Sequence, residues 1–413
     1  MNKRLIIINV VEYPFFDLPG GAARLAHDLC CQQVKWGYQV FLIGKKLNPD
    51  LPDFETRDGI NVIRCAETNY RSPDPRNLIK HIINARNAVK NIILDFGNVD
   101  VIHSHTPMQG LGALTAVSGS STLRIYSIHS PWLLEMQAGK NWEKNSNLGQ
   151  YIKSKAAFKV AKYIEESCLS RSDFITSDSE FTKKEIFKNY ARTIKNNYFD
   201  VFPGWVDVNR FSPIGPRANW ESELGHTAKG PVFFSLRRLE PRYGLEMLIE
   251  AAALVKKKKL IFELIIGGDG PLKVKLQKQI QKLSLEDRVI LLGRVEDSRL
   301  PILYRSSDVF VLPTLALECF GIIILEALAS GKPVIATPVG AIPEIMAQIF
   351  PEGILHEISS RALSEAMIRY IKLIKSGGLT KDQANRFRQH VCEHYSIESG
   401  TSRFKELYET SSI

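Results

Sequence analysis

Short runs of β-branched residues alternate with amphipathic helical segments along the whole chain, and this alternation most restricts its fold. One such helical segment carries apolar residues on a single face, namely Leu245, Leu248, Ile249, Ala252 and Val255. Short apolar runs separated by helical patterns are typical of parallel strands that are buried on both faces and joined by helices. The pattern therefore predicts an α/β fold with parallel sheets covered by helices.

The expected strands form two successive series. The first comprises Arg4–Val10, Gln39–Ile43, Ile60–Arg64, Val99–His103, Arg124–His129, Phe174–Ser177 and Asp200–Phe202; the second comprises Val232–Leu236, Phe262–Ile266, Val289–Leu292, Val309–Leu312, Val334–Ala336 and Gly353–Leu355. A chain of 413 residues also exceeds one ordinary hydrophobic core. We therefore predict two Rossmann-like, doubly wound domains, residues 1–205 and 206–395. The join lies in Val206–Gly230, which is rich in proline and glycine, and a helix in 396–413 is expected to pack back on the first domain.

Three features of the sequence bear on location. No apolar run reaches the roughly 18 to 20 residues that a membrane-spanning helix needs. The apolar stretch within Met1–Val10 is short and lacks a following cleavage site, so we interpret it as a buried first strand rather than a signal peptide. The six cysteines form no C-x-x-C pair. These observations favour a reducing, cytoplasmic setting.

The formal net charge of +10 is compatible with phosphate-bearing substrates, an anionic membrane surface or nucleic acid, although no nucleic-acid motif is present. The run Lys256–Lys259 is interpreted as a solvated helix end. A second basic region interleaves lysines with aromatic residues: Lys140, Trp142, Lys144, Tyr151, Lys153, Lys155, Phe158, Lys159, Lys162 and Tyr163. Its two interpretations are a solvated helix face and contact with anionic lipid or a lipid-linked acceptor.

The segment Leu312–Thr337 carries the strongest signal for a binding site. A strand ends at Leu312, a loop carries Glu318, and a helix starts near Phe320–Gly321. The first amides of such a helix point outward and bind phosphate, and open α/β sheets bind ligands at the carboxyl ends of their strands. Glu318 precedes the helix and Glu326 lies inside it, so one carboxylate is expected to meet a sugar and the other a ribose.

This segment resembles the retaining GT-B glycosyltransferases called group 1, or family 4. The E-x7-E pattern Glu318 to Glu326 is followed by Ser330–Ala336 and Val339–Glu344, and the resemblance covers nearly the whole chain. It implies two Rossmann-like domains facing a central cleft. It also implies that Glu318 contacts the donor sugar, that Glu326 contacts the ribose hydroxyls, and that the helix start at Phe320, Gly321 and Ile322 holds the diphosphate.

Residues Phe234–Gly244 resemble the segment G-R-L-x-x-x-K-G of this family, whose arginine and lysine grip the donor diphosphate. Arg238 matches the arginine, but Tyr243 occupies the lysine position. Arg242, next to it, is a candidate for the missing cation, because positive charge stabilises the diphosphate as it leaves. Leu292–Val295 resembles the loop that reads the nucleotide base, which implies roles for Arg294 and Val295.

Three features of the first domain also resemble the family. Gly20 and Gly21 lie in the segment Leu18–Arg24, which resembles the glycine loop facing the donor; a plain tight turn is the alternative. His129 resembles the family histidine near the anomeric carbon, and a packed imidazole is the alternative. Val201–Asp207 resembles the interdomain P-N-G-V-D stretch, but Gly204 and Trp205 replace its asparagine and glycine. His103 and His105 lack a third ligand, so a zinc site is disfavoured.

The expected function is a retaining, metal-independent hexosyltransferase that uses a nucleotide diphosphate-sugar and no other cofactor. The expected acceptor is a saccharide or lipid-linked molecule of surface polysaccharide or glycolipid synthesis. No D-x-D pair is placed for a metal, and Asp178 stands alone in Ser177-Asp-Ser179. The alternatives are a noncatalytic nucleotide-sugar-binding partner of another transferase and a GT-B nucleotide-sugar epimerase. A cytoplasmic location is expected, with a peripheral position on the inner membrane face as a further hypothesis.

Overall fold

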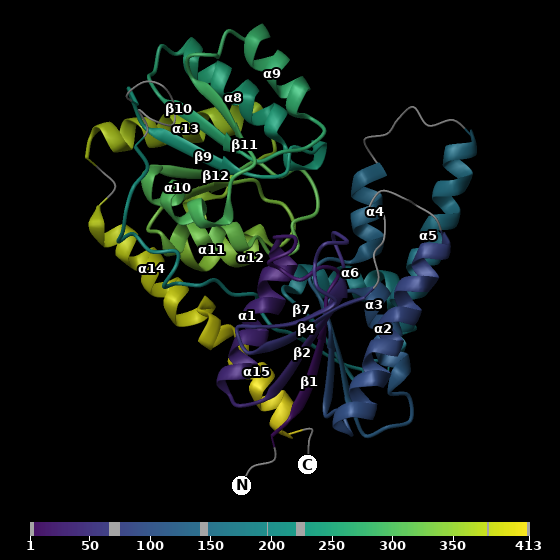
Figure 1. Ribbon diagram of the computed structural model, residues 1–413. Coiled ribbons are helices and arrows are strands. Elements are labelled where there is room, and N and C mark those ends of the chain that lie inside the picture. Colours follow the sequence, from purple (N-terminus) through teal and green to yellow (C-terminus); the bar gives the residue numbers. More distant parts are fainter. Residues whose placement is uncertain are drawn as a thin grey trace. The chain divides into compact units, whose positions relative to one another are not determined.

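The computed structural model describes residues 4–65, 75–140, 148–195, 197–219, 228–377 and 380–410. The chain divides into two compact units (Figure 1). The first unit comprises residues 1–204 together with 400–413, and the second comprises residues 205–399. Each unit is an α/β domain built around its own sheet, so the predicted α/β class with two domains and parallel sheets is confirmed.

The first unit contains an eight-stranded sheet in the order β3-β4-β2-β1-β5-β6-β7-β8. Only β3, at the edge, pairs in the antiparallel direction among these strands. Their bounds are β1 Ile6–Val10, β2 Gln39–Lys45, β3 Phe54–Arg57, β4 Ile60–Cys65, β5 Val101–Ser104, β6 Leu123–Ile128, β7 Phe174–Ser177 and β8 Tyr198–Val201. The strand order reverses between β1 and β5, which defines the switch point of this sheet.

Helices cover both faces of this sheet (Figure 1). One face carries α1 (Gly21–Lys35) and α15 (Ile397–Thr410); the other carries α2 (Pro75–Phe96), α3 (Pro107–Ala116) and α5 (Leu148–Arg171). Two shorter helices, α4 (Trp132–Lys140) and α6 (Glu180–Tyr190), follow β6 and β7. Apolar side chains of α2, α3 and α5 form one buried cluster with those of the central strands, including Ile8, Ile102 and Tyr126.

The second unit contains a five-stranded, wholly parallel sheet in the order β11-β10-β9-β12-β13. The strands are β9 Val232–Leu236, β10 Glu263–Gly267, β11 Val289–Gly293, β12 Val309–Leu312 and β13 Val334–Ala336. Its α-helices are α8 Leu245–Lys257, α9 Lys273–Lys282, α10 Leu300–Ser306, α11 Ile322–Ala329, α12 Ile342–Ile349, α13 Ser360–Lys375 and α14 Lys381–Tyr395. Short 3-10 turns span Pro241–Tyr243, Asp297–Arg299 and Pro351–Gly353. The switch point lies between β9 and β12.

The sheets differ from the predicted strands at two places. Gly353–Leu355 is not a strand: it follows a 3-10 turn and makes a single bridge, between Ile354 and Ala336. The short edge strand β3 was not expected, because its residues are mostly exposed and carry no apolar run. In the basic region, Trp142 and Lys144 lie outside the described residues.

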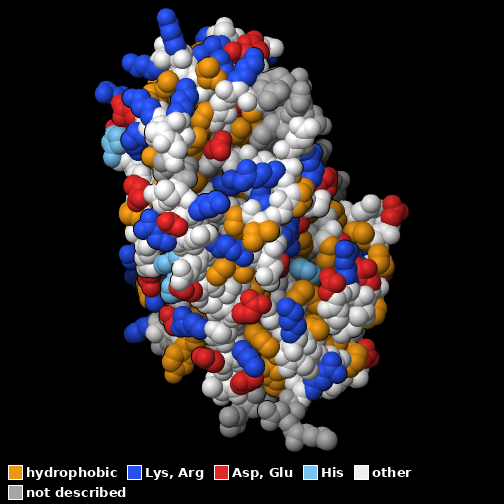
Figure 2. All heavy atoms as spheres, turned by 90° about the vertical axis from the view of Figure 1, so that its left-hand side faces the viewer, with side chains coloured by type: hydrophobic (Ala, Val, Ile, Leu, Met, Phe, Trp, Pro, Cys, Tyr) orange, Lys and Arg blue, Asp and Glu red, His pale blue; other side chains and the backbone are white. Residues whose placement is uncertain are grey.

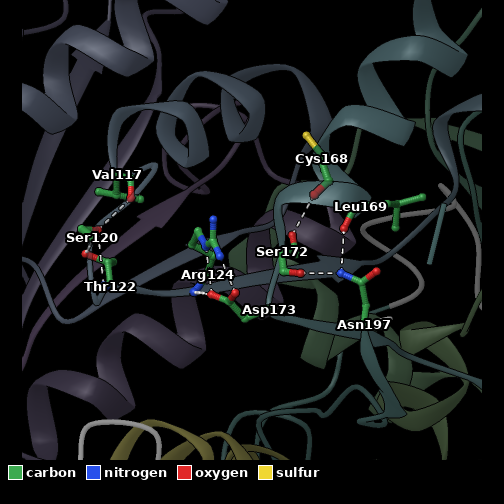
Figure 3. A network of polar contacts seen from close by, with 9 residues as sticks. All are labelled: Val117, Ser120, Thr122, Arg124, Cys168, Leu169, Ser172, Asp173 and Asn197. Carbon is green, nitrogen blue, oxygen red and sulfur yellow. Dashed lines mark hydrogen bonds and ion pairs between the residues drawn. The ribbon is translucent and has the colours of Figure 1, made fainter. Parts of the chain in front are cut away.

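A polar network fixes the amino ends of β6 and β7, opposite the edge where ligands bind in such sheets (Figure 3). The guanidinium of Arg124 donates to both carboxylate oxygens of Asp173, at 2.9 and 2.5 Å. Asn197 donates to the carbonyls of Leu169 and Ser172, at 3.1 and 2.5 Å. These bonds hold the register in which the carboxyl ends of the two strands meet.

Surface charge is mixed on the face drawn in Figure 2, where Lys and Arg side chains stand among acidic and apolar ones. The helices in the described ranges include none with the length and apolarity to cross a membrane.

Candidate functional site

The switch point of the second unit brings together a guanidinium and a carboxylate. Arg237 directly follows β9, and Glu318 lies in the loop after β12. Arg237 Nη2 forms an ion pair with Glu318 Oε2 and donates to Thr314 Oγ1 at 3.1 Å. Thr314 Oγ1 in turn donates to Glu318 Oε2 at 3.3 Å. The result is a polar cluster at the sheet edge where an open α/β sheet binds its ligand.

Helix α11 begins beside this cluster. Gly321 precedes it with φ of 91°, a left-handed conformation that glycine adopts without strain. The N–H of Ile324 bonds to the Gly321 carbonyl at 2.9 Å, whereas the amide of Ile322 lies ahead of the helical hydrogen bonds. Phe320 is buried just before this turn. The helix start therefore offers backbone donors and the positive end of a dipole to an anion.

Glu326 lies one turn inside α11 and is buried. Its Oε2 accepts a 2.8 Å hydrogen bond from the hydroxyl of Tyr304, on α10. Burial raises the pKa of Tyr304, and the nearby Glu326 raises it further. The phenol therefore stays a hydrogen-bond donor and fixes the orientation of the Glu326 carboxylate.

The other two arginines of this segment are placed differently from Arg237. Arg238 is 68% exposed and forms an ion pair with Glu240 at 2.8 Å. Arg242 Nη2 donates to the hydroxyl of Tyr243 at 2.5 Å, and its Nη1 lies 3.5 Å from the Leu317 carbonyl. Arg242 therefore reaches the loop that carries Glu318, whereas Arg238 projects toward solvent.

Arg294 and Val295 follow β11, two strands from β9 in the same sheet. Arg294 is exposed, and Val295 is half-buried against the core of the second unit. The backbone of this loop is tied to the turn after β10, because the Gly268 N–H bonds to the Gly293 carbonyl at 2.7 Å.

In the first unit, Gly20 and Gly21 lie at the start of α1, near the switch point between β1 and β5. Gly20 caps the helix in an extended conformation, and both glycines are exposed. A Cβ atom at Gly20 would meet nothing within 4 Å. The chain itself therefore does not require glycine at this position.

Three side chains immediately follow neighbouring strands of the first unit: His105 after β5, His129 after β6 and Asp178 after β7. His129 Nδ1 lies 2.9 Å from Asp178 Oδ2, and His129 Nε2 lies 3.0 Å from His105 Nδ1. The two imidazole rings are nearly parallel, with an interplanar angle of 4° and their centroids 5.3 Å apart. Burial, and then the neighbouring His103 and His129, lower the pKa of His105 well below its usual value. Asp178, which the sequence leaves alone, is the carboxylate that orients His129.

His103 belongs to a second hydrogen-bond chain in the same unit. Gln33 Nε2 donates to the Tyr408 hydroxyl at 3.0 Å, so the phenol proton is directed to His103 Nδ1, 2.8 Å away. The neutral His103 ring then carries its proton on Nε2 and donates to Ser127 Oγ at 2.6 Å. Burial, with a smaller effect of His129, lowers the pKa of His103 to about 3. This chain ties α15, which carries Tyr408, to the strands of the first unit.

The structure thus brings Glu318, Phe320, Gly321 and Ile322 together in one unit, and places His129 among buried polar groups in the other. Within the described ranges, no group of three or more His, Cys, Asp or Glu side chains is arranged to hold a metal ion. Sequence reasoning missed Arg237 and Asp178. The signal for Asp178 was its position one residue after a strand, the same offset as that of His129 from the neighbouring strand.

Comparisons with known proteins match both units. A family model described as glycosyl transferases group 1 matches residues 216–389, and one described as glycosyltransferase family 4 matches residues 19–210. A relative, an uncharacterized glycosyltransferase of Methanocaldococcus jannaschii, is 28% identical over 81% of this chain and 80% of its own length.

Two solved structures share the fold. The sucrose-phosphate synthase of Thermosynechococcus elongatus has a TM-score of 0.80 at 19% identity, covering 98% of this chain and 99% of that one. The Anabaena protein HepE, in complex with UDP and glucose, has a TM-score of 0.72 at 17% identity, covering 98% of this chain and 100% of that one. At these identities the likeness concerns the fold.

Proposed function

Because the chain belongs to the glycosyltransferases of group 1, family 4, we propose that it transfers a hexose from a nucleotide diphosphate-sugar with retention of anomeric configuration. The acceptor is a saccharide or lipid-linked molecule of surface polysaccharide or glycolipid synthesis. The enzyme acts in the cytoplasm, at the inner face of the membrane. The family assignment and the polar groups gathered around the start of α11 support this proposal.

One observation carries the donor assignment: two buried glutamates flank the first turn of α11, and a guanidinium lies beside one of them. Glu318 accepts hydrogen bonds from the donor sugar, and Glu326 accepts them from the ribose. The diphosphate is held by the start of the helix at Phe320, Gly321 and Ile322. Arg238 stabilises the negative charge that grows as the diphosphate leaves.

The remaining contacts follow the family resemblance. Arg242 adds positive charge near the diphosphate, and the backbone at Arg294 and Val295 reads the base. Gly20 and Gly21 allow close approach of the substrate to the first unit's backbone. His129, oriented by Asp178, contacts the transferred sugar near its anomeric carbon.

Transfer breaks the bond between the anomeric carbon and the leaving phosphate oxygen and forms a bond from that carbon to the acceptor oxygen on the same face. The proton of the acceptor hydroxyl passes to the leaving phosphate. Arginine side chains and helix amides stabilise the departing charge, so no metal ion is required. The proposal assigns no nucleophilic side chain.

The proposal is tested with purified protein, UDP- and GDP-linked radiolabelled hexoses, and a membrane fraction as the source of acceptor, in the presence of EDTA. We expect label to enter a lipid or polysaccharide product, with the anomeric configuration of the donor preserved in its NMR spectrum. Glu326→Gln and Arg238→Ala should each lower transfer about 10²-fold or more. Glu365→Gln, at an exposed ion pair in the same unit, is the matched control and should leave transfer unchanged.

Two rival functions predict other results. A noncatalytic nucleotide-sugar-binding partner, suggested by Tyr243 at the family lysine position, would bind the donor and transfer nothing when purified alone. An epimerase would release nucleotide or an altered sugar without acceptor. A fully active Arg238→Ala enzyme would refute the assignment of Arg238 to the donor site.

A further inference from the structure

Two residues depart from the family segment G-R-L-x-x-x-K-G, and they lie against each other. Arg237 occupies the position of the first glycine, and Tyr243 occupies that of the lysine. The Arg237 guanidinium carbon is 4.8 Å from the centroid of the Tyr243 ring. Tyr243 removes the cation of the family lysine, and Arg237 adds a cation at the glycine position. The added guanidinium lies over the Tyr243 ring.

The backbone of Arg237 is held firmly at the end of β9. Its N–H bonds to the Gly267 carbonyl at 3.0 Å. Gly268 approaches so closely that a Cβ atom there would be 1.7 Å from the Arg237 carbonyl oxygen. Gly267 and Gly268 therefore fix the backbone of Arg237. The side chain of Arg237 contacts Thr314, Glu318 and Tyr243, and these contacts set its direction.

The guanidinium of Arg237 uses only half of its hydrogen-bonding edge within the chain. Nη2 is bonded to Thr314 and Glu318, whereas the adjacent Nε is buried without a hydrogen-bond partner among the described residues. Nε and Nη2 form the edge that binds carboxylate or phosphate through two parallel bonds. Since buried donors are rarely left unsatisfied, this edge has the arrangement expected of a site that awaits an anion.

The Tyr243 ring contacts a second guanidinium as well. The Arg242 guanidinium carbon is 4.6 Å from the ring centroid, and its Nη2 donates to the phenol oxygen. Arginine stacks on aromatic faces, so the ring is a platform that positions both cations. The Tyr243 ring thus joins the two guanidinium groups to the loop that carries Glu318, beside the start of α11.

We propose that Arg237, positioned by the Tyr243 ring, binds the donor diphosphate in place of the lysine that Tyr243 replaces. This inference rests on the proposed function, because it names a further residue of the same donor site. Glu318 is the resting partner of Arg237. When the donor binds, its phosphate oxygens take over the Nε and Nη2 edge of Arg237, and the released Glu318 carboxylate accepts hydrogen bonds from the donor sugar.

The test measures by calorimetry the binding of UDP, GDP and ADP, each beside its monophosphate, to the full chain. For the nucleoside diphosphate that the wild type binds, Arg237→Gln should raise Kd about 10- to 100-fold. The monophosphate, which lacks the β-phosphate, should lose about threefold or less, because ribose and base contacts are unchanged. Arg361→Gln removes an exposed arginine of the same unit and serves as the matched control, with wild-type affinity expected.

A second pair of variants keeps the result independent of any loss of folding. Arg237→Gly alone should bind the diphosphate weakly, and the double variant Arg237→Gly with Tyr243→Lys, which restores the family pattern, should recover most of the affinity. Arg237→Lys keeps a charge beside Glu318 without the planar fork and should fall between wild type and Arg237→Gln. Thermal unfolding of each variant reports whether it is folded.

The outcomes separate the two proposals. Wild-type affinity for the diphosphate in a folded Arg237→Gln variant would overturn the role of Arg237 and leave the proposed function standing. An equal loss for the monophosphate and the diphosphate, or failure of the double variant to recover, would show that Arg237 only maintains the fold and would also overturn the inference. A wild-type chain that binds none of the three diphosphates would overturn both.

Discussion

Replacing His103 with asparagine is expected to weaken the dependence of the first unit's stability on pH. Burial lowers the pKa of His103 from its ordinary 6.5 to about 3, so the folded unit keeps this ring neutral. Between these two values the unfolded chain binds the extra proton. Stability from the neutral ring is therefore complete above about pH 6.5 and is lost progressively as the pH falls toward 3.

The size of the stability change follows from the lowered pKa of His103. pH 5 lies about 1.5 units below the unfolded pKa of 6.5. At about 1.36 kcal/mol per unit, protonation of His103 in the unfolded chain lowers the free energy of unfolding by about 2 kcal/mol. His105 acts in the same direction, since its pKa is also lowered by burial. The wild type should therefore lose at least about 2 kcal/mol between pH 8 and pH 5, and His103→Asn should lose about 2 kcal/mol less.

The assay is urea unfolding at pH 8 and at pH 5, read by hydrogen exchange and mass spectrometry on peptides from β5 and β6. Reading these peptides isolates the first unit in a chain of two units. The value at pH 8 gives the cost of the substitution itself, and the difference between the two pH values isolates protonation. Equal pH dependence in the wild type and His103→Asn would refute the reasoning.

Four other outcomes are expected. Tyr408→Phe should lower the unfolding free energy of the first unit by about 1 to 3 kcal/mol in the same assay, because His103 Nδ1 loses its donor; unchanged stability would contradict this bond. Tyr304→Phe should weaken nucleoside diphosphate binding about two- to tenfold in calorimetry, since Glu326 loses the donor that orients it. Gly268→Ala should destabilise the second unit by about 2 kcal/mol or more in urea unfolding read on β9 and β10, because φ there is 137° and the added carbon meets the Arg237 carbonyl. Removing divalent ions with EDTA should leave the rate of sugar transfer unchanged, and a rate restored only by Mg²⁺ would count against a donor site made of arginines and amides.

The parallel strands were predictable because their residues alone carry the signal. β9, β12 and β13 are short buried runs of β-branched and aromatic residues, and periodicity identifies such runs without tertiary information. The edge strand β3 was not predicted, because it is stabilised by pairing with β4 and has no apolar pattern of its own. Gly353–Leu355 had a strand-like composition, but the turn at Pro351 leaves only one bridge to β13.

The candidate site likewise contains residues whose place could be predicted from local sequence and residues whose place could not. Glu318 and Glu326 lie in one continuous segment, so their relation to the start of α11 could be predicted locally. The proposed role of Arg237 could not be predicted in this way, because the surroundings of its side chain depend on packing against Gly268 and Tyr243. The hydrogen bond between Tyr408 and His103 joins residues 305 positions apart, so no local sequence pattern could predict it.

The central claim is that helix amides and arginine side chains of the second unit hold the donor diphosphate. The most direct measurement is a crystal structure of the chain with UDP or GDP, whichever binds, grown in the presence of EDTA. We predict phosphate oxygens on the Ile322 amide and on the guanidinium groups of Arg237 and Arg238, with the ribose hydroxyls on Glu326. A nucleotide bound away from the carboxyl ends of β9 and β12, or bound there only through a divalent ion, would contradict the account.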